Sequence, residues 1–121
     1  MSWQFNHTEA VFLQIANRLR ADILNGKYLP DEQVPSVRHL AAEAAVNPNT
    51  VQKALTLLEE EGILYTKGTV GRFITSDEAA LDTAREKMRR ESVRRWLNEA
   101  RTLGISPEEL INYIRKEDCI S

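Results

Sequence analysis

The stretch Val34–Gly62, with the sequence VPSVRHLAAEAAVNPNTVQKALTLLEEEG, decides the fold of this chain. It contains two short helical patterns. Ser36 can accept a hydrogen bond from a free first-turn amide, so it begins the first helix, which ends around Ala45–Val46. Asn47 is the expected cap of the second helix, and Pro48 suits the first helical position because its missing amide needs no partner there. Two helices joined by so short a turn predict a helix-turn-helix.

Helical and strand patterns flank this stretch on both sides. Before it, apolar residues recur at steps of three and four over residues 9–25, as one face of a helix requires. After it, residues 63–66 and 72–75 are rich in β-branched and aromatic types, and a turn with two glycines joins them. This pattern predicts a β-hairpin. A helix-turn-helix followed directly by a hairpin is the pattern of a winged helix.

The rest of the chain predicts two more helices. Residues 77–103 contain neither Gly nor Pro, so one helix of about 40 Å can span them. Ser106–Glu109 matches the capped first turn of a final short helix, which we expect to end near Lys116. The expected fold is mainly α with a small β-hairpin wing. It comprises a winged helix-turn-helix domain over residues 1–75 and a two-helix tail over residues 76–121.

Composition and charge fit a folded protein of this size. The 121 residues are 42% hydrophobic and 28% charged, and 16 Lys and Arg against 18 Asp and Glu give a formal net charge of -2. This balance excludes a protein that coats nucleic acid by bulk charge, but a local basic patch is compatible with it. No apolar run approaches the ~20 residues needed to span a membrane. The first ten residues lack the pattern of a secretory signal, so we expect a soluble cytoplasmic protein with no membrane partner.

Residue types that carry catalytic and metal chemistry are scarce. The chain has two histidines, His7 and His39, and one cysteine, Cys119. These three residues do not supply a nucleophile–base pair or a soft metal site. Lys67–Thr69 lacks the upstream glycine and the following helix of a phosphate-binding loop. We therefore expect no enzyme activity, no metal and no cofactor.

The first turn of the second helix of the helix-turn-helix is unusually polar. A helix of this length fits the DNA major groove, where its N-terminal residues meet base edges. Asn and Gln can pair in two places with adenine, and Lys can reach guanine or a phosphate. Taken alone, the cluster fits DNA binding and an ordinary solvated helix surface about equally well. Its hydrogen-bonding residues are Asn47, Asn49, Thr50, Gln52 and Lys53.

Four separate blocks of the chain occur in the order and spacing of a known family. They are Leu13–Ala16 (LQIA), Val34–Ala41 (VPSVRHLA), Val46–Ala54 (VNPNTVQKA) and Leu58–Gly62 (LEEEG). Together they resemble the winged-helix domain of GntR-family bacterial transcription regulators over residues 5–75. The short two-helix tail resembles that of the YtrA-like subfamily, whose members lack the large effector-binding domain of other branches.

The resemblance implies a sequence-specific DNA-binding transcription regulator, with repression as the favoured action. It assigns Arg38 to DNA contact from the first helix of the motif, and Lys67 and Gly68 to a wing tip near the minor groove. Ser36 is expected to cap its helix and also to touch a phosphate. The wing departs from the family pattern of Gly, basic residue, Gly, Thr and Phe, because Thr69–Phe73 is TVGRF. The expected DNA-binding residues are Ser36, Arg38, Asn47, Asn49, Thr50, Gln52, Lys53, Lys67, Gly68 and Arg72.

The long tail helix carries both basic and apolar side chains. Basic residues outnumber acidic ones over residues 85–101, which fits a second DNA-contacting surface or a solvated face, and we favour the solvated face. Its apolar residues have little of their own chain to pack against, so a partner subunit is the simplest cover. A two-fold dimer would place two recognition helices one DNA turn apart and match a palindromic operator. The expected dimerisation residues are Met88, Val93, Trp96, Leu97 and Ala100.

Three alternatives stay open at this stage. Without the family resemblance, Arg38 is explained as a solvated charge or as a partner of Glu43. A winged helix can also serve as a protein-interaction module without DNA, although polar residues on the second helix argue against that function. A small-molecule effector between the tail and the winged domain is compatible with the sequence, but no set of residues predicts its pocket.

Overall fold

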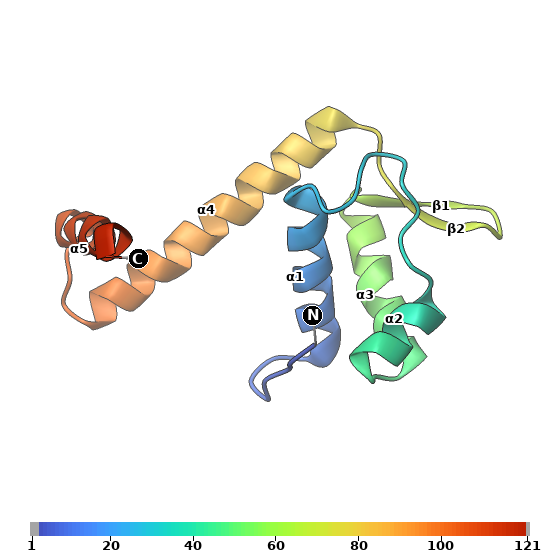
Figure 1. Ribbon diagram of the computed structural model, residues 1–121, viewed down its shortest axis with the longest axis horizontal. Helices are drawn as coiled ribbons and strands as arrows, with labels where there is room; N and C mark the ends of the chain where they lie inside the picture. The colour runs from blue at the N-terminus through green and yellow to red at the C-terminus, as the bar shows by residue number, and fades with distance from the viewer. Residues whose placement is uncertain (1–2, 121) are drawn as a thin grey trace. The chain divides into compact units, whose positions relative to one another are not determined.

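The computed structural model describes residues 3–120, which form five helices and one two-stranded antiparallel sheet. This architecture confirms the expected fold class, a winged helix-turn-helix followed by a helical tail. The chain divides into two compact units, and the boundary lies inside the long fourth helix. They are the winged unit, Met1–Ala84, and the tail unit, Arg85–Ser121. In chain order the elements are α1 (Val11–Leu24), α2 (Val37–Ala44), α3 (Pro48–Glu60), β1 (Leu64–Lys67), β2 (Gly71–Ile74), α4 (Glu78–Thr102) and α5 (Pro107–Ile120) (Figure 1).

The core of the winged unit forms where α3 packs against α1 and α2. Ile15 and Leu19 from α1, and Val51, Leu55 and Leu58 from α3, are each at most 1% exposed. Spacings of three and four residues place these side chains on one face of each helix. That face fixes the rotation of α3 about its own axis, so the polar residues between the buried positions point away from the core.

Side-chain caps begin both helices of the helix-turn-helix, as the sequence predicts. The Ser36 hydroxyl accepts a hydrogen bond over 3.1 Å from an amide in the first turn of α2. Asn47 Oδ1 accepts one over 2.8 Å from the Asn49 amide, and Pro48 is the first residue of α3. Between the helices, Ala45 has a φ of +56°, a left-handed conformation that costs a residue with a side chain about 1–2 kcal/mol.

The wing is the hairpin of β1 and β2, and a further segment pairs with it. Lys67 lies opposite Gly71 where the two strands meet the turn. Residues 31–34, for which the sequence pattern predicts only a connector, run beside β2. The Val34 amide, for example, donates to the Arg72 carbonyl over 2.9 Å. This backbone pairing joins segments that are far apart in the sequence, so no local periodicity predicts it.

Gly71 is required where this added segment meets the wing. Its φ is +139°, and a Cβ atom at this position would lie 2.8 Å from Gln33 Nε2. The same nitrogen donates a hydrogen bond to the Val70 carbonyl over 2.9 Å. A side chain at residue 71 would therefore strain the backbone and displace the amide that supports the turn of the wing.

Two helices make up most of the tail, and their first turns are capped by side chains. Asp77 Oδ1 accepts from the Ala80 amide over 3.1 Å at the start of α4. At the start of α5, Ser106 and Glu109 exchange reciprocal side chain–backbone hydrogen bonds of 3.2 Å each, which confirms the predicted capping box. The prediction that this helix ends near Lys116 is wrong, because α5 continues to residue 120. The sequence beyond Lys116 contains no Gly or Pro to stop it.

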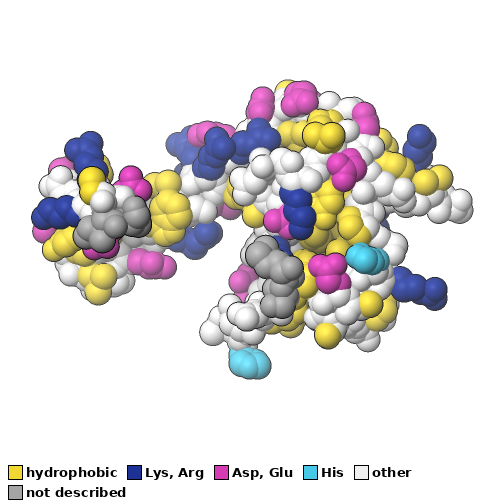
Figure 2. Space-filling view, viewed as in Figure 1, with side chains coloured by type: hydrophobic (Ala, Val, Ile, Leu, Met, Phe, Trp, Pro, Cys, Tyr) yellow, Lys and Arg dark blue, Asp and Glu magenta, His cyan; other side chains and the backbone are white. Residues whose placement is uncertain are grey.

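Apolar side chains of the tail unit are largely uncovered. Ala100, at 5%, is its one buried hydrophobic residue among those described. Figure 2 shows hydrophobic side chains at the surface of this unit. None of the described helices has the length and apolar character needed to cross a membrane. The large hydrophobic residues that stay exposed in the tail unit are Val93, Trp96, Leu103, Ile111, Tyr113 and Ile114.

Candidate nucleic-acid interface

The first turns of α3 present a polar, exposed face. Since Val51, Ala54 and the following buried residues turn toward the core, the side chains between them face outward. Asn49 and Gln52 are exposed, and Thr50 is half-buried. A rigid helix therefore carries amide and hydroxyl groups that can form hydrogen bonds with a ligand. This arrangement agrees with the orientation that the sequence predicts for a recognition helix.

Two of the predicted DNA-binding residues also form hydrogen bonds within the protein, as helix caps. Asn47 Oδ1 accepts from the Asn49 amide, so the side-chain nitrogen of Asn47 is the group that stays available to donate. The Ser36 oxygen accepts from the amide of α2, but its hydroxyl hydrogen can still be given to an anion. Both residues are exposed. A cap and a ligand contact are therefore compatible at each position.

Arg38 lies exposed on α2 and has no hydrogen bond or ion pair with any described residue. Glu43, its alternative partner in the sequence, is occupied elsewhere. Trp3 Nε1 donates to Glu43 Oε1 over 3.0 Å, and His39 Nε2 lies 3.3 Å from Glu43 Oε2. The hydrogen bond from Trp3 lowers the pKa of the Glu43 carboxyl below its ordinary value. The Arg38 guanidinium is therefore left with its donors directed to solvent.

Lys53 makes a contact that the sequence pattern does not predict. Its Nζ atom lies 4.1 Å from the centroid of the Phe12 ring, so the ammonium of α3 sits over an aromatic face of α1. Lys53 is still exposed. A periodicity that places Phe12 on the apolar face of its helix is the one signal that could have pointed to this pair. The contact draws the Lys53 side chain toward α1.

The wing tip carries the basic residue and the glycine that the sequence places there. Lys67 and Gly68 are both exposed, and Gly68 has a φ of +52° in the turn. Lys67 Nζ lies 5.8 Å from the centroid of the Phe73 ring on the opposite strand. Beside them, Val70 is 60% exposed. The tip is thus short, with one cation that solvent or a ligand can reach.

Arg72 lies against α3 and not at the wing tip. Its side chain is 15% exposed, and its Nη1 donates to Gln52 Oε1 over 3.4 Å. Its Nε is 3.8 Å from Glu59 Oε2. The same carboxylate accepts a hydrogen bond from the Thr66 hydroxyl on β1. These side chains join the wing to the recognition helix, a long-range contact that the sequence pattern does not predict.

The predicted dimerisation residues do not share one environment. Val93 and Trp96 are 47% and 55% exposed, whereas Met88 and Leu97 are half-buried. Ala100 is buried within its own chain, so it contacts neighbouring parts of the same subunit. The sequence prediction omits exposed apolar residues at the end of α4 and on α5, namely Leu103, Ile111, Tyr113 and Ile114. On the last helix, the three-residue spacing of Ile111 and Ile114 is the signal that could have included these two residues.

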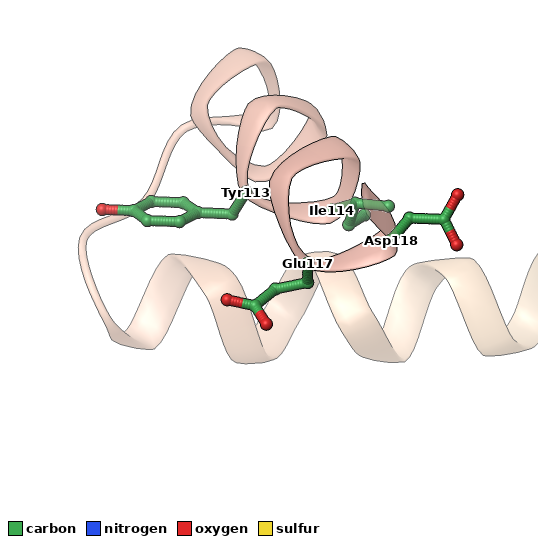
Figure 3. Close-up of a pocket in the computed structure, with 4 residues that line it drawn as sticks. All are labelled: Tyr113, Ile114, Glu117 and Asp118. Carbon is green, nitrogen blue, oxygen red and sulfur yellow. The ribbon is translucent and has the colours of Figure 1, made fainter. Parts of the chain in front are cut away.

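The depression that the structure shows on α5 is open and does not enclose a ligand. It is lined by Tyr113, Ile114, Glu117 and Asp118. Figure 3 shows Tyr113 and Asp118 pointing to opposite sides of the helix, so these side chains do not converge on one ligand. Residues 3–120 also contain no group of three or more His, Cys, Asp or Glu side chains that could hold a metal ion.

Comparison with known proteins identifies the family. The family model described as bacterial regulatory proteins, gntR family, matches residues 12–74. The HTH-type transcriptional repressor YtrA of Bacillus subtilis (strain 168) is 32% identical over 107 residues, which are 88% of this chain and 82% of that protein.

Solved structures agree with this assignment. A GntR family transcriptional regulator from Listeria monocytogenes has a TM-score of 0.86 at 29% identity, over 93% of this chain and 98% of that chain. The DNA-binding domain of AraR, solved in complex with operator ORX1, has a TM-score of 0.54 at 26% identity, over 60% of this chain and 93% of that chain. The family match over more than half of the residues, together with the shared fold, shows that this chain belongs to the GntR family of bacterial transcription regulators and is similar to YtrA over most of its length.

Proposed function

We propose that this regulator is a dimeric repressor that binds a palindromic operator through α3, Arg38 and the wing. The observation that carries the proposal is the exposed first part of α3, where hydrogen-bonding side chains stand on a helix whose other face is fully buried. Such a helix can enter the major groove without rearrangement, and its polar residues meet base edges there. The related AraR domain is seen with operator DNA, which supports the same class of ligand for this chain.

Positive charge for the DNA backbone comes from a few placed residues. Arg38 has no internal partner among the described residues, so its guanidinium can bind a phosphate or the edge of a guanine without breaking a contact. Lys67 at the wing tip is the second exposed cation of the proposed surface. Because the net charge of the chain is -2, affinity depends on these local contacts and on the pairing of two subunits.

The tail supplies the proposed dimer contact. Exposed apolar residues such as Trp96 and Ile114 cost free energy in water, and a second copy of the same helices is a chemically matched cover. In this proposal residues 1–75 bind DNA and residues 76–121 hold two such domains together. A two-fold dimer bound to an operator would repress by covering the promoter.

Substitution of Arg38 tests the proposed interface. The probe is the duplex selected by the wild-type protein from random DNA. We expect Arg38→Ala to raise the Kd for this duplex about 10- to 100-fold, since a charged hydrogen bond contributes about 1.5–3 kcal/mol. If each Arg38 of the dimer contacts one phosphate, the magnitude of the slope of log K against log salt also falls by about 1.8, because two contacts are lost.

The matched control is Arg115→Ala, which removes an exposed arginine from α5. It should leave the Kd within about twofold of wild type, because surface substitutions away from a contact have effects of at most about 0.5 kcal/mol. Circular dichroism should show the same helix content in all three proteins. An Arg38→Ala protein that is folded and binds like wild type would show that Arg38 lies outside the DNA interface.

A further inference from the structure

The contact between the wing and α3 contains a cation that is almost enclosed. Arg72 extends from β2 toward α3, where its guanidinium meets Gln52 on the exposed face and Glu59 about two turns further along. Its side chain is 15% exposed, and its Nε atom is buried with no hydrogen-bond partner among the described residues. A phosphate contact needs hydrogen-bond donors at the protein surface, and most of the Arg72 guanidinium is turned away from that surface.

The direction of the Gln52 amide follows from the chemistry of arginine. A guanidinium has hydrogen-bond donors and no acceptor, so the Gln52 atom that faces Arg72 must be the carbonyl oxygen. The oxygen keeps a second lone pair, but because it is turned toward Arg72, the amide nitrogen is the part of Gln52 that faces a ligand more freely. The exposed Gln52 side chain thus offers donors outward.

We propose that Arg72 is a positioning residue which, by holding the oxygen of Gln52, makes Gln52 select guanine over adenine at one operator position. This inference rests on the proposed binding of α3 in the major groove. Guanine presents two acceptors there, N7 and O6, and an outward amide nitrogen can donate to both. Adenine presents an acceptor and a donor, so it needs both the nitrogen and the oxygen of a glutamine. With its oxygen turned toward Arg72, Gln52 is poorly oriented for the adenine pairing that glutamine otherwise favours.

Binding to a set of mutated operators tests the assignment. The duplex selected by the wild-type protein is varied to all four base pairs at each position, and Kd values are measured for wild type, Gln52→Ala, Arg72→Met and the double variant. The position that Gln52 reads is the one where Gln52→Ala removes the preference. There, wild type should favour guanine. Arg72→Met should shift the guanine-to-adenine ratio of affinities toward adenine by about tenfold, since the freed amide can pair with adenine in two places.

Three further results distinguish positioning from other roles of Arg72. The double variant should behave like Gln52→Ala, because Arg72 acts through Gln52. The salt slope of Arg72→Met should equal that of wild type, whereas loss of one phosphate contact in each subunit lowers its magnitude by about 1.8. Lys67→Met is the matched control, since it removes an exposed cation from the same wing and should leave the base preference unchanged.

A second variant tests the same role if Arg72→Met does not fold. Arg72→Lys keeps a charge beside Glu59 but lacks the fork of donors that reaches Gln52 as well, so it should lose the guanine preference while melting close to wild type. If Arg72→Met and Arg72→Lys keep the guanine preference, or weaken all duplexes equally with a lower salt slope, the positioning role is wrong while α3 still reads DNA. If Gln52→Ala changes no position at all, the placement of Gln52 in the proposed interface fails, and the inference fails with it.

Discussion

The winged unit and the tail unit differ in where they keep their apolar side chains. In the winged unit, residues from α1, α2, α3 and the hairpin converge on one core, and Leu58 and Val51 are completely buried. In the tail unit, Trp96, Ile111 and Ile114 each remain about half exposed. The first unit therefore has a core of its own, whereas the second carries apolar surface that its own chain does not cover. Stability and assembly should respond to substitutions in different units.

The largest expected effect is the loss of a core side chain from the winged unit. Leu58→Ala should lower the free energy of unfolding by about 2–5 kcal/mol, because it removes a fully buried side chain and leaves a cavity. The matched change in the tail, Ile114→Ala, removes a half-exposed side chain. At concentrations where the protein is monomeric, it should cost less than about 1 kcal/mol. Urea unfolding measures both, and equal losses would contradict the contrast between the two units.

A charge on the apolar surface of the tail should act on assembly. Trp96→Glu places a carboxylate where we propose a subunit contact. The dimer Kd should rise by about 30-fold or more, which is the effect of removing an aromatic residue from the centre of an interface. The control is Asn98→Glu, since two residues along a helix correspond to a turn of about 200° and place it on the opposite side of α4.

Sedimentation velocity over a range of concentrations separates these variants. Asn98→Glu should sediment like wild type. The idea of a tail-mediated dimer would have to be abandoned if the wild-type chain itself were a monomer at micromolar concentration, or if Trp96→Glu did not change its association.

The smallest effect concerns a strained residue that the packing of the winged unit maintains. Ala45→Gly should raise the free energy of unfolding by up to about 1 kcal/mol, because glycine adopts the left-handed conformation without the cost borne by alanine. Ala42→Gly, at an exposed position inside α2, should lower it by about 1 kcal/mol. Thermal melts give both signs, and two destabilised variants would mean that the turn is not strained at Ala45. Neither substitution should alter the dimerisation that we propose for the other unit.

Local chemistry made much of the fold predictable from sequence. The caps at Ser36, Asn47 and Ser106 act within three residues, so these side chains predict the helix starts, and a Pro directly after Asn47 and after Ser106 supports two of them. The hairpin is predicted because the helical periodicity ends and two short runs of β-branched and aromatic residues follow, joined by a turn with two glycines. The end of α5 differs from the prediction because no Gly or Pro follows Lys116, so the helix continues to residue 120.

The predicted interface depended on packing that the sequence does not encode locally. Periodicity placed Gln52 on the exposed face of α3, and the structure agrees. It could not show that Arg72 turns inward to Gln52 and Glu59, or that Lys53 lies over Phe12, because both contacts form between elements that meet only in the folded chain. Arg38 is the opposite case. It has no hydrogen bond or ion pair with residues 3–120, a property of the fold that strengthens a role inferred from resemblance.

Selection of bound sites from random duplex DNA tests the central claim, that two copies of α3 read DNA as a symmetric pair. The account predicts an enriched inverted repeat whose half-sites are separated by about one helical turn, roughly 10–10.5 base pairs from centre to centre. Enrichment should fall when Trp96→Glu replaces the wild-type protein. A single asymmetric site, or no enrichment above the starting pool, would contradict it.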